Sequence, residues 1–395
     1  MFNILLLAFG FITAVFVGFN IGGSSTGVAF GPSVGSNVIS KVTAGILMSI
    51  FVLLGGWFVG RNVVETMGGQ IVPQNFFTLF ASVAILFFVG LALLISNLFG
   101  VPASTSMTAV GAISGLGVAT GSIKWPVIGR IVSWWIISPV IAFWLCTVVG
   151  RYIYPHLETR TQLSKNTGEL FTTRDSVIPL PKFHEDVNRT QIAGSMTVVA
   201  IGCYMAFSAG ASNVANAIAP LYGNGAISMN LGILMAAGAI SLGAFTIARR
   251  TLDTVGNDLT DLPILAALII EAISASIITF LSWNGIPASL AVTATCCIIG
   301  LGWGRATRTS TIAEMTMSGV EGRDPELNSL NRIARHEEGG KVKPIGEEEK
   351  LDKIDSIELF DPRSTARVVG LWVLTPTLSG VSSFLLFSVV SPTPL

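Results

Sequence analysis

Residues 210–220 read Gly-Ala-Ser-Asn-Val-Ala-Asn-Ala-Ile-Ala-Pro, and residues 22–32 read Gly-Gly-Ser-Ser-Thr-Gly-Val-Ala-Phe-Gly-Pro. The two stretches align without a gap at an offset of 188, and each follows an apolar run. Because glycine weakens a helix and proline removes a backbone donor, both stretches predict interrupted helices. Their shared pattern indicates an internal repeat around which the fold is organised.

The composition of the whole chain indicates a polytopic membrane protein. Only 12% of the 395 residues are charged and 51% are hydrophobic, whereas soluble domains carry roughly 25% charged residues. Residues 150–190 and 305–367 hold 35 of the 46 charged side chains. Eight apolar runs have the length that a helix needs to cross a bilayer: 3–19, 41–60, 74–98, 127–149, 191–209, 229–248, 263–283 and 366–391.

Two further pairs of matching segments follow in the same order. Gly-Val-Pro-Ala-Ser at 100–104 aligns with Gly-Ile-Pro-Ala-Ser at 285–289, and Trp-Ile-Ile-Ser-Pro at 135–139 aligns with Trp-Val-Leu-Thr-Pro at 372–376. Duplication with interrupted segments at corresponding positions is typical of secondary transporters. We therefore predict an all-α polytopic membrane protein with two inverted-topology repeats and broken or re-entrant helices.

Four apolar stretches are interrupted by Gly, Pro, Ser and Thr: 20–37, 99–121, 210–228 and 284–304. Within a membrane, an irregular backbone survives only where protein buries it or where it lines a wet cavity. Function is therefore expected in these four stretches. The sequence leaves open whether 99–121 and 284–304 cross the membrane or turn back.

The repeat and the charge pattern together predict the organisation of the chain. The expected units are a first transmembrane repeat (1–149), a linker loop (150–190), a second repeat (191–304), a polar loop (305–365) and a last helix (366–395). The two polar loops contain 17 of the 23 Lys and Arg residues, which predicts that both are cytoplasmic. Both termini of this multi-pass cell-membrane protein are then expected outside.

Several functional classes are excluded by composition. The net charge is zero and no motif supplies a basic surface for nucleic acid. The three histidines lie in polar segments, and the four cysteines have no metal-ligand spacing, so no metal or other cofactor is expected. No nucleophile–base pair stands out at membrane depth, and an enzyme is the least favoured class. The expected partners are the lipid bilayer and a small solute, and a homodimer is compatible with the sequence.

Polar side chains at membrane depth are the first candidates for a site. The repeated stretch contains Ser24, Ser25, Thr26, Ser212, Asn213 and Asn216. Close packing of two helices requires only glycine and alanine, and an unpaired polar group in an apolar environment is costly. We therefore interpret these residues as lining a site, with close helix packing as the alternative.

The second candidate is a pair of helix starts inside the bilayer. Pro102 and Pro287 are each followed by Ser or Thr residues, which suit the first turn of a helix. Such a start directs free N–H groups and the positive end of the helix dipole at the cavity, so it binds an anion without Lys or Arg. Alternatively, the hydroxyls bond to carbonyls one turn back. The candidate anion ligands are Ser104, Thr105, Ser106 and Ser289.

Four charged or aromatic positions have competing interpretations. Glu271 is the one carboxylate well inside an apolar run, so it is either functional or a neutral core residue. Glu65 is expected to form a gating or capping salt bridge with Arg61. Trp134 and Trp135 are expected to anchor helices at the membrane interface.

At these residues the sequence resembles the inorganic phosphate transporter (PiT) family. That family carries a duplicated Gly-Ala-Asn-Asp-x-Ala-Asn-Ala motif, of which 210–217 is a close copy and 22–29 a degenerate one. Its duplicated Pro-Val-Ser-Thr-Thr-His motif corresponds to the segments that begin at Pro102 and Pro287. The resemblance implies a secondary transporter that moves inorganic phosphate with a coupling cation, Na⁺ or H⁺.

This chain departs from the family at the charged motif positions. The family aspartate is Ser25 in the first copy and Asn213 in the second, and the family histidine is Met107 and Val292. Neutral oxygens still coordinate Na⁺, but without the charge. Phosphate carries protons that need hydrogen-bond acceptors, whereas sulfate carries none and needs only hydrogen-bond donors. A carboxylate accepts from phosphate and repels sulfate, so the loss of both carboxylates favours sulfate.

The sequence therefore predicts a phosphate transporter, with a sulfate permease or an uncoupled anion channel as alternatives. The expected substrate ligands are Ser24, Ser104, Thr105, Ser106, Ser212, Asn216 and Ser289. The expected cation-coupling residues are Ser25, Asn213 and Glu271, the last for protons where Na⁺ is not used.

Overall fold

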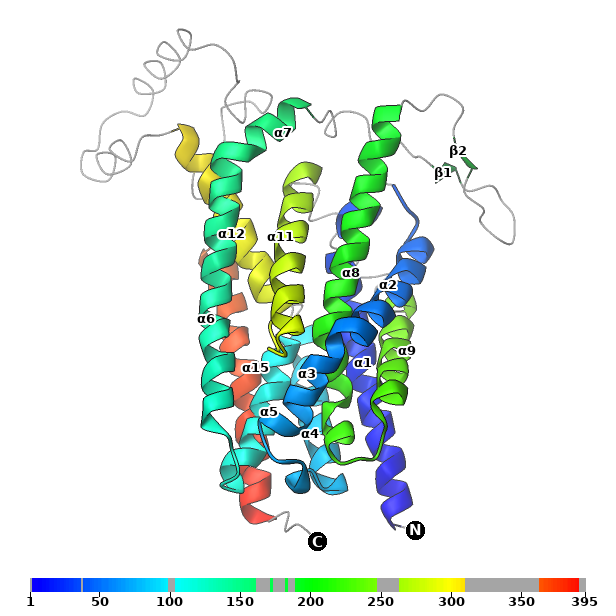
Figure 1. The fold of residues 1–395 in the computed structure, drawn as a ribbon, viewed down its shortest axis with the longest axis vertical. Helices are drawn as coiled ribbons and strands as arrows, with labels where there is room; N and C mark the ends of the chain where they lie inside the picture. The colour runs from blue at the N-terminus through cyan, green and yellow to red at the C-terminus, as the bar shows by residue number, and fades with distance from the viewer. Residues whose placement is uncertain are drawn as a thin grey trace, which may run out of the picture.

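The computed structural model describes residues 2–36, 38–98, 104–160, 171–172, 182–183, 189–246, 263–309 and 362–390. These residues form an elongated bundle of helices that run mostly along one axis (Figure 1). Eight helical segments are long and apolar enough to cross a membrane. Each coincides with one of the eight apolar runs, so the all-α polytopic prediction is confirmed.

The helices, in chain order, are α1 (Phe2–Gly35), α2 (Lys41–Gly55), α3 (Arg61–Glu65), α4 (Leu79–Leu98), α5 (Thr105–Ala119), α6 (Trp125–Val148), α7 (Tyr154–Arg160), α8 (Arg189–Gly223), α9 (Met229–Thr246), α11 (Ile264–Trp283), α12 (Leu290–Thr309) and α15 (Pro362–Val389). Wider π-helical turns η1 (Gly56–Gly60) and η2 (Thr66–Gln70) flank α3, the 3₁₀ turn η3 (Gln74–Phe76) precedes α4, and the π-helical turn η4 (Val149–Ile153) joins α6 to α7. A two-residue antiparallel pair, β1 (Phe171–Thr172) and β2 (Lys182–Phe183), lies in the predicted linker.

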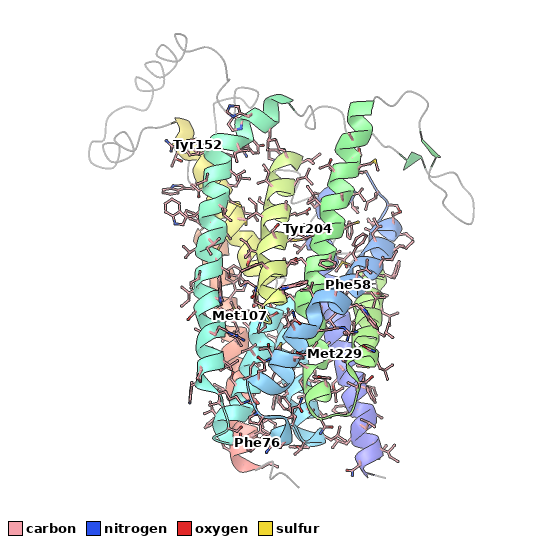
Figure 2. All side chains as sticks on the ribbon, in the orientation of Figure 1. Phe58, Phe76, Met107, Tyr152, Tyr204 and Met229 are labelled. Carbon is pink, nitrogen blue, oxygen red and sulfur yellow. The ribbon has the colours of Figure 1, made fainter. Side chains whose placement is uncertain are left out.

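The outer surface of the bundle is apolar, as a lipid environment requires. Large side chains project outward along its length, among them Phe58 and Tyr152 (Figure 2), which are 65% and 61% exposed. Soluble proteins rarely expose continuous apolar surface on this scale. The surface therefore agrees with a multi-pass membrane protein.

The predicted interruption of residues 20–37 and 210–228 is wrong. Helix α1 continues to Gly35 and α8 continues to Gly223, and each carries its proline, Pro32 or Pro220, in the final turn. A proline there removes only one backbone hydrogen bond close to the helix end. The glycines of these stretches instead allow neighbouring backbones to approach closely.

The other two interrupted stretches turn back inside the bundle. Helices α4 and α5 form one hairpin, and α11 and α12 form another, and the two enter from opposite ends and meet near the middle (Figure 1). The 15 residues of α5 span about 22 Å, less than the roughly 30 Å of a bilayer core. The backbone N–H of Lys124, after α5, donates to the carbonyl of Ile71, before α4, at 3.0 Å. The α4–α5 hairpin thus returns to the end from which it entered.

The two halves exchange packing partners. Helix α1 packs on α9 and α2 packs on α8, while α5 packs on α15 and α12 packs on α6. Every one of these pairs joins a helix of the first half to a helix of the second. A large part of the core therefore lies between the halves, beside the packing of α1 on α4 and of α8 on α11 within them.

Residues related by the offset of 188 make equivalent contacts. A Cβ atom at Gly22 would overlap the carbonyl oxygen of Ile240, and one at Gly210 would overlap the carbonyl oxygen of Val52. Gly210 and Ile240 are the counterparts of Gly22 and Val52 in the repeat. Only glycine permits this approach, which explains why the repeated stretch is rich in small residues.

Helices extend into both segments that the sequence predicted to be polar loops. Helix α6 continues through η4 and α7 to Arg160, so the first part of the predicted loop 150–190 is helical. Most of that loop and nearly all of the predicted loop 305–365 lie outside the described residues. The start of α1 and the end of α15 lie at one end of the bundle, and α7 lies at the other (Figure 1).

Candidate functional site

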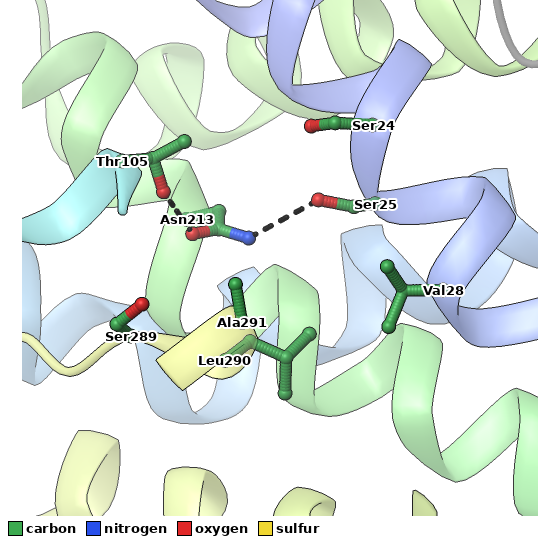
Figure 3. Close-up of a pocket in the computed structure, with 8 residues that line it drawn as sticks. All are labelled: Ser24, Ser25, Val28, Thr105, Asn213, Ser289, Leu290 and Ala291. Carbon is green, nitrogen blue, oxygen red and sulfur yellow. Dashed lines mark hydrogen bonds between the residues drawn. The ribbon is translucent and has the colours of Figure 1, made fainter. Parts of the chain in front are cut away.

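A cavity of about 30 Å³ lies where the starts of α5 and α12 meet α1 and α8 (Figure 3). Its walls come equally from both halves of the chain: α1 and α5 from the first, α8 and α12 with the residue before it from the second. The lining residues are Ser24, Ser25, Val28, Thr105, Asn213, Ser289, Leu290 and Ala291. Five of the ten residues proposed from sequence therefore line one cavity.

The two residues that replace the motif aspartates meet each other at this cavity. Asn213 Nδ2 donates to Ser25 Oγ at 3.4 Å, and Thr105 Oγ1 donates to Asn213 Oδ1 at 2.9 Å (Figure 3). Ser25 and Asn213 are equivalent positions of the repeat. Their contact places the junction of the two halves inside the site.

Asn216 connects α8 to the start of α5. Its Nδ2 lies within 3.1 Å of both Thr105 Oγ1 and Ser106 Oγ, and 3.2 Å from Asn213 Oδ1. The side chain of Asn216 is fully buried. Because the amide donates to these hydroxyl oxygens, the hydroxyl hydrogens remain to be directed at other acceptors.

Ser212 links the two hairpins. Its Oγ lies 3.3 Å from Ser106 Oγ and donates to the backbone carbonyl of Ala288 at 2.8 Å. Ser106 belongs to the first hairpin and Ala288 to the tip of the second. Ser212 is fully buried and lies behind the cavity wall, so its position supports the site without forming its surface.

Two buried polar atoms beside the cavity have no hydrogen-bond partner among the described residues. They are Ser104 Oγ and Asn216 Oδ1, and both side chains are fully buried. An unsatisfied buried donor or acceptor costs about 1–3 kcal/mol. Such atoms indicate a place where a solute, an ion or water supplies the missing partner.

Both hairpin helices begin at the cavity. Thr105 and Leu290 are the first residues of α5 and α12, and both line the cavity. The Ser289 hydroxyl accepts from the N–H of Val292 at 3.3 Å, whereas Ser104 makes no such capping bond. Two helix N-termini thus direct their dipoles at one small volume, an arrangement that favours an anion.

Some hydroxyls follow the alternative interpretation and bond to their own helix. Thr26 Oγ1 donates to the Gly22 carbonyl at 2.7 Å, and Ser24 Oγ donates to the Ile21 carbonyl at 3.1 Å. Thr26 is fully buried and does not line the cavity, whereas Ser24 does. Bonding one turn back therefore accounts for Thr26 and leaves Ser24 in the site.

Glu271 lies apart from the cavity. It is 5% exposed within α11, and neither carboxyl oxygen has a hydrogen-bond partner among the described residues. The neighbouring Ser274 hydroxyl bonds to the carbonyls of Ile270 and Glu271 in its own helix. Among the residues that the structure describes, the cavity lining contains no Asp, Glu, His, Lys or Arg.

The salt bridge expected between Arg61 and Glu65 is absent from the described residues. Arg61 instead donates to Asn230 Oδ1 at 2.7 Å and to the Trp57 carbonyl at 2.8 Å, and its guanidinium lies 4.6 Å from the Trp57 ring centre. The four-residue spacing brings Arg61 back onto Trp57, and the start of α9 supplies the second acceptor. Glu65 is exposed.

Sequence reasoning missed two side chains that hold the tip of the second hairpin. Asn62 Nδ2 donates to the Trp283 carbonyl, and Trp135 Nε1 donates to the Pro287 carbonyl. Trp134 packs edge to face against Phe280 instead, at 6.3 Å between ring centres. An amide inside an apolar helix was the available signal for Asn62, whereas the adjacent tryptophans look alike in sequence.

The sequence of this chain is similar to those of known membrane permeases. Residues 21–320 match the phosphate transporter family. The sulfate permease CysP of Bacillus subtilis is 31% identical over 290 residues, which cover 73% of this chain and 75% of that protein. A putative phosphate permease of Haemophilus influenzae is 27% identical over 376 residues, covering 74% and 87%.

A solved structure described as the sodium-dependent phosphate transporter has the same fold. It superposes with a TM-score of 0.66 over 98% of this chain and 100% of that chain, at 17% sequence identity. The family match covers both hairpins, the cavity and most of the exchanged packing between halves. This chain belongs to the phosphate transporter family.

Proposed function

We propose that this protein is a secondary transporter that moves inorganic phosphate, a small tetrahedral oxyanion, across the cell membrane. The observation that carries the proposal is the meeting of two helix N-termini at one hydroxyl-lined cavity. Oriented N–H and O–H donors stabilise an anion there without a fixed positive charge. Of the anion ligands expected from the sequence, Ser24, Thr105 and Ser289 line the cavity and would contact the anion, while the fully buried Ser104, Ser106, Ser212 and Asn216 would support them from behind the cavity wall.

The transport cycle follows from two inverted halves around this cavity. Two hairpins that enter from opposite ends support inversion, because each half then contributes one hairpin from its own side (Figure 1). Rocking one set of helices against the other exposes the same site alternately to the two sides. In this arrangement both termini are outside and the polar loops 150–190 and 305–365 are cytoplasmic.

Ser25 and Asn213 are the proposed cation ligands. Their oxygens lie at the junction of the halves, and Asn216 Oδ1 adds a buried carbonyl oxygen that has no partner among the described residues. Hard cations such as Na⁺ take neutral hydroxyl and carbonyl oxygens. A cation bound here offsets the charge of the anion beside it, so binding of each favours binding of the other.

Sulfate is the second candidate substrate, and the neutral character of the described cavity lining favours it. The Asn216 amide donates to Thr105 Oγ1 and Ser106 Oγ, and the Thr105 hydroxyl donates in turn to Asn213 Oδ1, the acceptor that a bound anion would replace. None of the described residues that line the cavity is a carboxylate able to accept a proton from phosphate. A site made of donors suits a fully ionised oxyanion, and a related protein is described as a sulfate permease.

Uptake into proteoliposomes tests the proposal. We expect labelled phosphate to accumulate inside liposomes that contain the purified protein, driven by an inward Na⁺ gradient. Labelled sulfate is measured in parallel, with and without Na⁺. If only sulfate accumulates, with or without Na⁺, the protein is a sulfate transporter rather than a phosphate transporter. Equilibration without accumulation would identify an uncoupled anion channel.

Glu271→Gln tests proton coupling through the buried carboxyl. An ionised carboxylate without a partner is costly in apolar surroundings, so this side chain is suited to holding and releasing one proton. If a proton gradient rather than Na⁺ drives accumulation, we expect the variant to lose that accumulation while it still exchanges labelled for unlabelled substrate. Exposed Glu158→Gln is the matched control and keeps both activities. Undiminished gradient-driven uptake by Glu271→Gln would remove this residue from coupling.

A further inference from the structure

The tip of the α11–α12 hairpin, residues 283–289, is held from outside by side chains of two other helices. Asn62 of α3 donates to the Trp283 carbonyl at 2.6 Å. Trp135 of α6 donates through its ring nitrogen to the Pro287 carbonyl at 2.8 Å. The two bonds attach opposite ends of one short irregular segment to two separate elements.

These bonds satisfy carbonyls that the tip cannot satisfy by itself. The last carbonyls of a helix and those of an irregular segment lack intrahelical partners, and within a membrane an unpaired carbonyl is costly. Gly285 makes the turn with φ of +68°, and a Cβ there would lie 2.7 Å from Thr66 Oγ1. The tip is thus seated against α3 and η2, two residues before the carbonyl that Trp135 holds.

The held segment leads directly into the site. Ser289 follows the Pro287 carbonyl by two residues and lines the cavity, and Leu290 begins α12. A displacement of the tip therefore moves both the Ser289 hydroxyl and the N-terminus of α12. The contacts of Asn62 and Trp135 act on the anion site through the backbone of the tip, not by touching the solute.

We propose that Asn62 and Trp135 are positioning residues that form a releasable latch on the α11–α12 tip. With the latch closed, Ser289 and the start of α12 face the cavity; with it open, the tip moves away and the cavity opens to water. The proposal rests on the proposed transport function only for its role in the cycle. Neutral hydrogen bonds suit a latch because each is worth little enough to break and re-form during turnover.

A cysteine reporter in the cavity measures the latch directly. Ala291→Cys is introduced into a protein whose native Cys146, Cys203, Cys296 and Cys297 are replaced by serine or alanine, and the rate of labelling by a water-soluble maleimide is followed. Trp135→Phe removes the N–H donor but keeps an aromatic ring, and Asn62→Leu removes the amide at similar size. We expect each to speed labelling by up to about tenfold, the shift that loss of one ordinary hydrogen bond permits.

Two variants serve as matched controls. Trp134→Phe changes the adjacent tryptophan, which packs on Phe280 in an edge-to-face contact. Asn224→Leu removes a different amide donor, one that bonds to the Phe77 carbonyl away from the tip. Both are expected to label at the parent rate. Folding of each variant is judged by its melting temperature. The labelling rate of either latch variant that folds is enough to test the latch.

Uptake by the same proteins separates a latch from a purely structural contact. We expect Trp135→Phe and Asn62→Leu to raise KM for phosphate or sulfate several-fold more than they lower kcat, because the anion ligands are displaced rather than removed. Unchanged labelling in folded latch variants would overturn the latch even in a protein that transports. Faster labelling in a protein that takes up neither anion would keep the latch and reject the proposed function.

Discussion

Asn216→Leu is expected to lower kcat/KM for oxyanion uptake by roughly 100-fold, the largest effect of any single substitution at the site. The Asn216 amide is the common donor to Thr105, Ser106 and Asn213. An amide makes two good hydrogen bonds at a time, each worth about 1 kcal/mol, and its removal also leaves buried partners unsatisfied. A combined loss of about 3 kcal/mol corresponds to that factor.

The measurement is initial uptake rate against substrate concentration in proteoliposomes, with protein content matched. Asn224→Leu, the same change at a half-buried amide outside the cavity, is expected to transport as the parent does. Asn216→Asp keeps the Oδ1 oxygen but replaces the Nδ2 donor with a second acceptor oxygen. An Asn216→Leu protein with a kcat/KM within threefold of the parent would contradict the role of this amide.

Gly22→Ala and Gly210→Ala are expected to destabilise the fold strongly. A Cβ atom at either position would overlap a backbone carbonyl of the partner helix, which has no side-chain freedom to move aside. Overpacking of a well-packed interior costs about 1–3 kcal/mol, and a clash with backbone lies at the upper end. Both variants should therefore melt several degrees lower in detergent or fail to accumulate as folded protein.

Gly238→Ala provides the matched control on the partner helix α9. Nothing lies within 4 Å of a Cβ there, although Gly238 is only two residues from Ile240, against which Gly22 packs. Alanine is favoured over glycine in a helix by about 0.5–1 kcal/mol, so this variant should melt at the parent temperature or slightly above. Equal melting of Gly22→Ala and Gly238→Ala would show that the close approach is unimportant.

The membrane-spanning helices could be predicted because bilayer thickness imposes a length that hydropathy reveals. The path of the backbone through residues 20–37 could not, because the reason for Gly22 lies on another helix. Local rules assign glycine a helix-breaking cost, but at this position its small size is required by the carbonyl of Ile240. Sequence shows that a residue is small, and only packing shows what its size permits.

The cavity residues were largely predictable because the repeat identified them twice. Ser25 and Asn213 occupy equivalent positions, and the structure brings them into contact. Glu271 was found by the rarity of carboxylates at membrane depth, a criterion that says nothing of which neighbours it faces. Asn62 and Trp135 act on a carbonyl more than 150 residues away, a relation that the sequence alone does not express.

The exchange of helices between the halves has a consequence for biosynthesis. Helix α1 packs on α9 and α2 on α8, so the surfaces that the first two helices bury are made about 150 to 220 residues after them. At translation rates of about 5–20 residues per second, the early helices stay in the membrane for roughly 10–40 s without their partners. During that interval the helix backbone at Gly22 and Gly55, which no side chain covers, is exposed to lipid or to the insertion machinery. A nascent chain arrested before α8 should therefore be the form most exposed to membrane quality-control proteases.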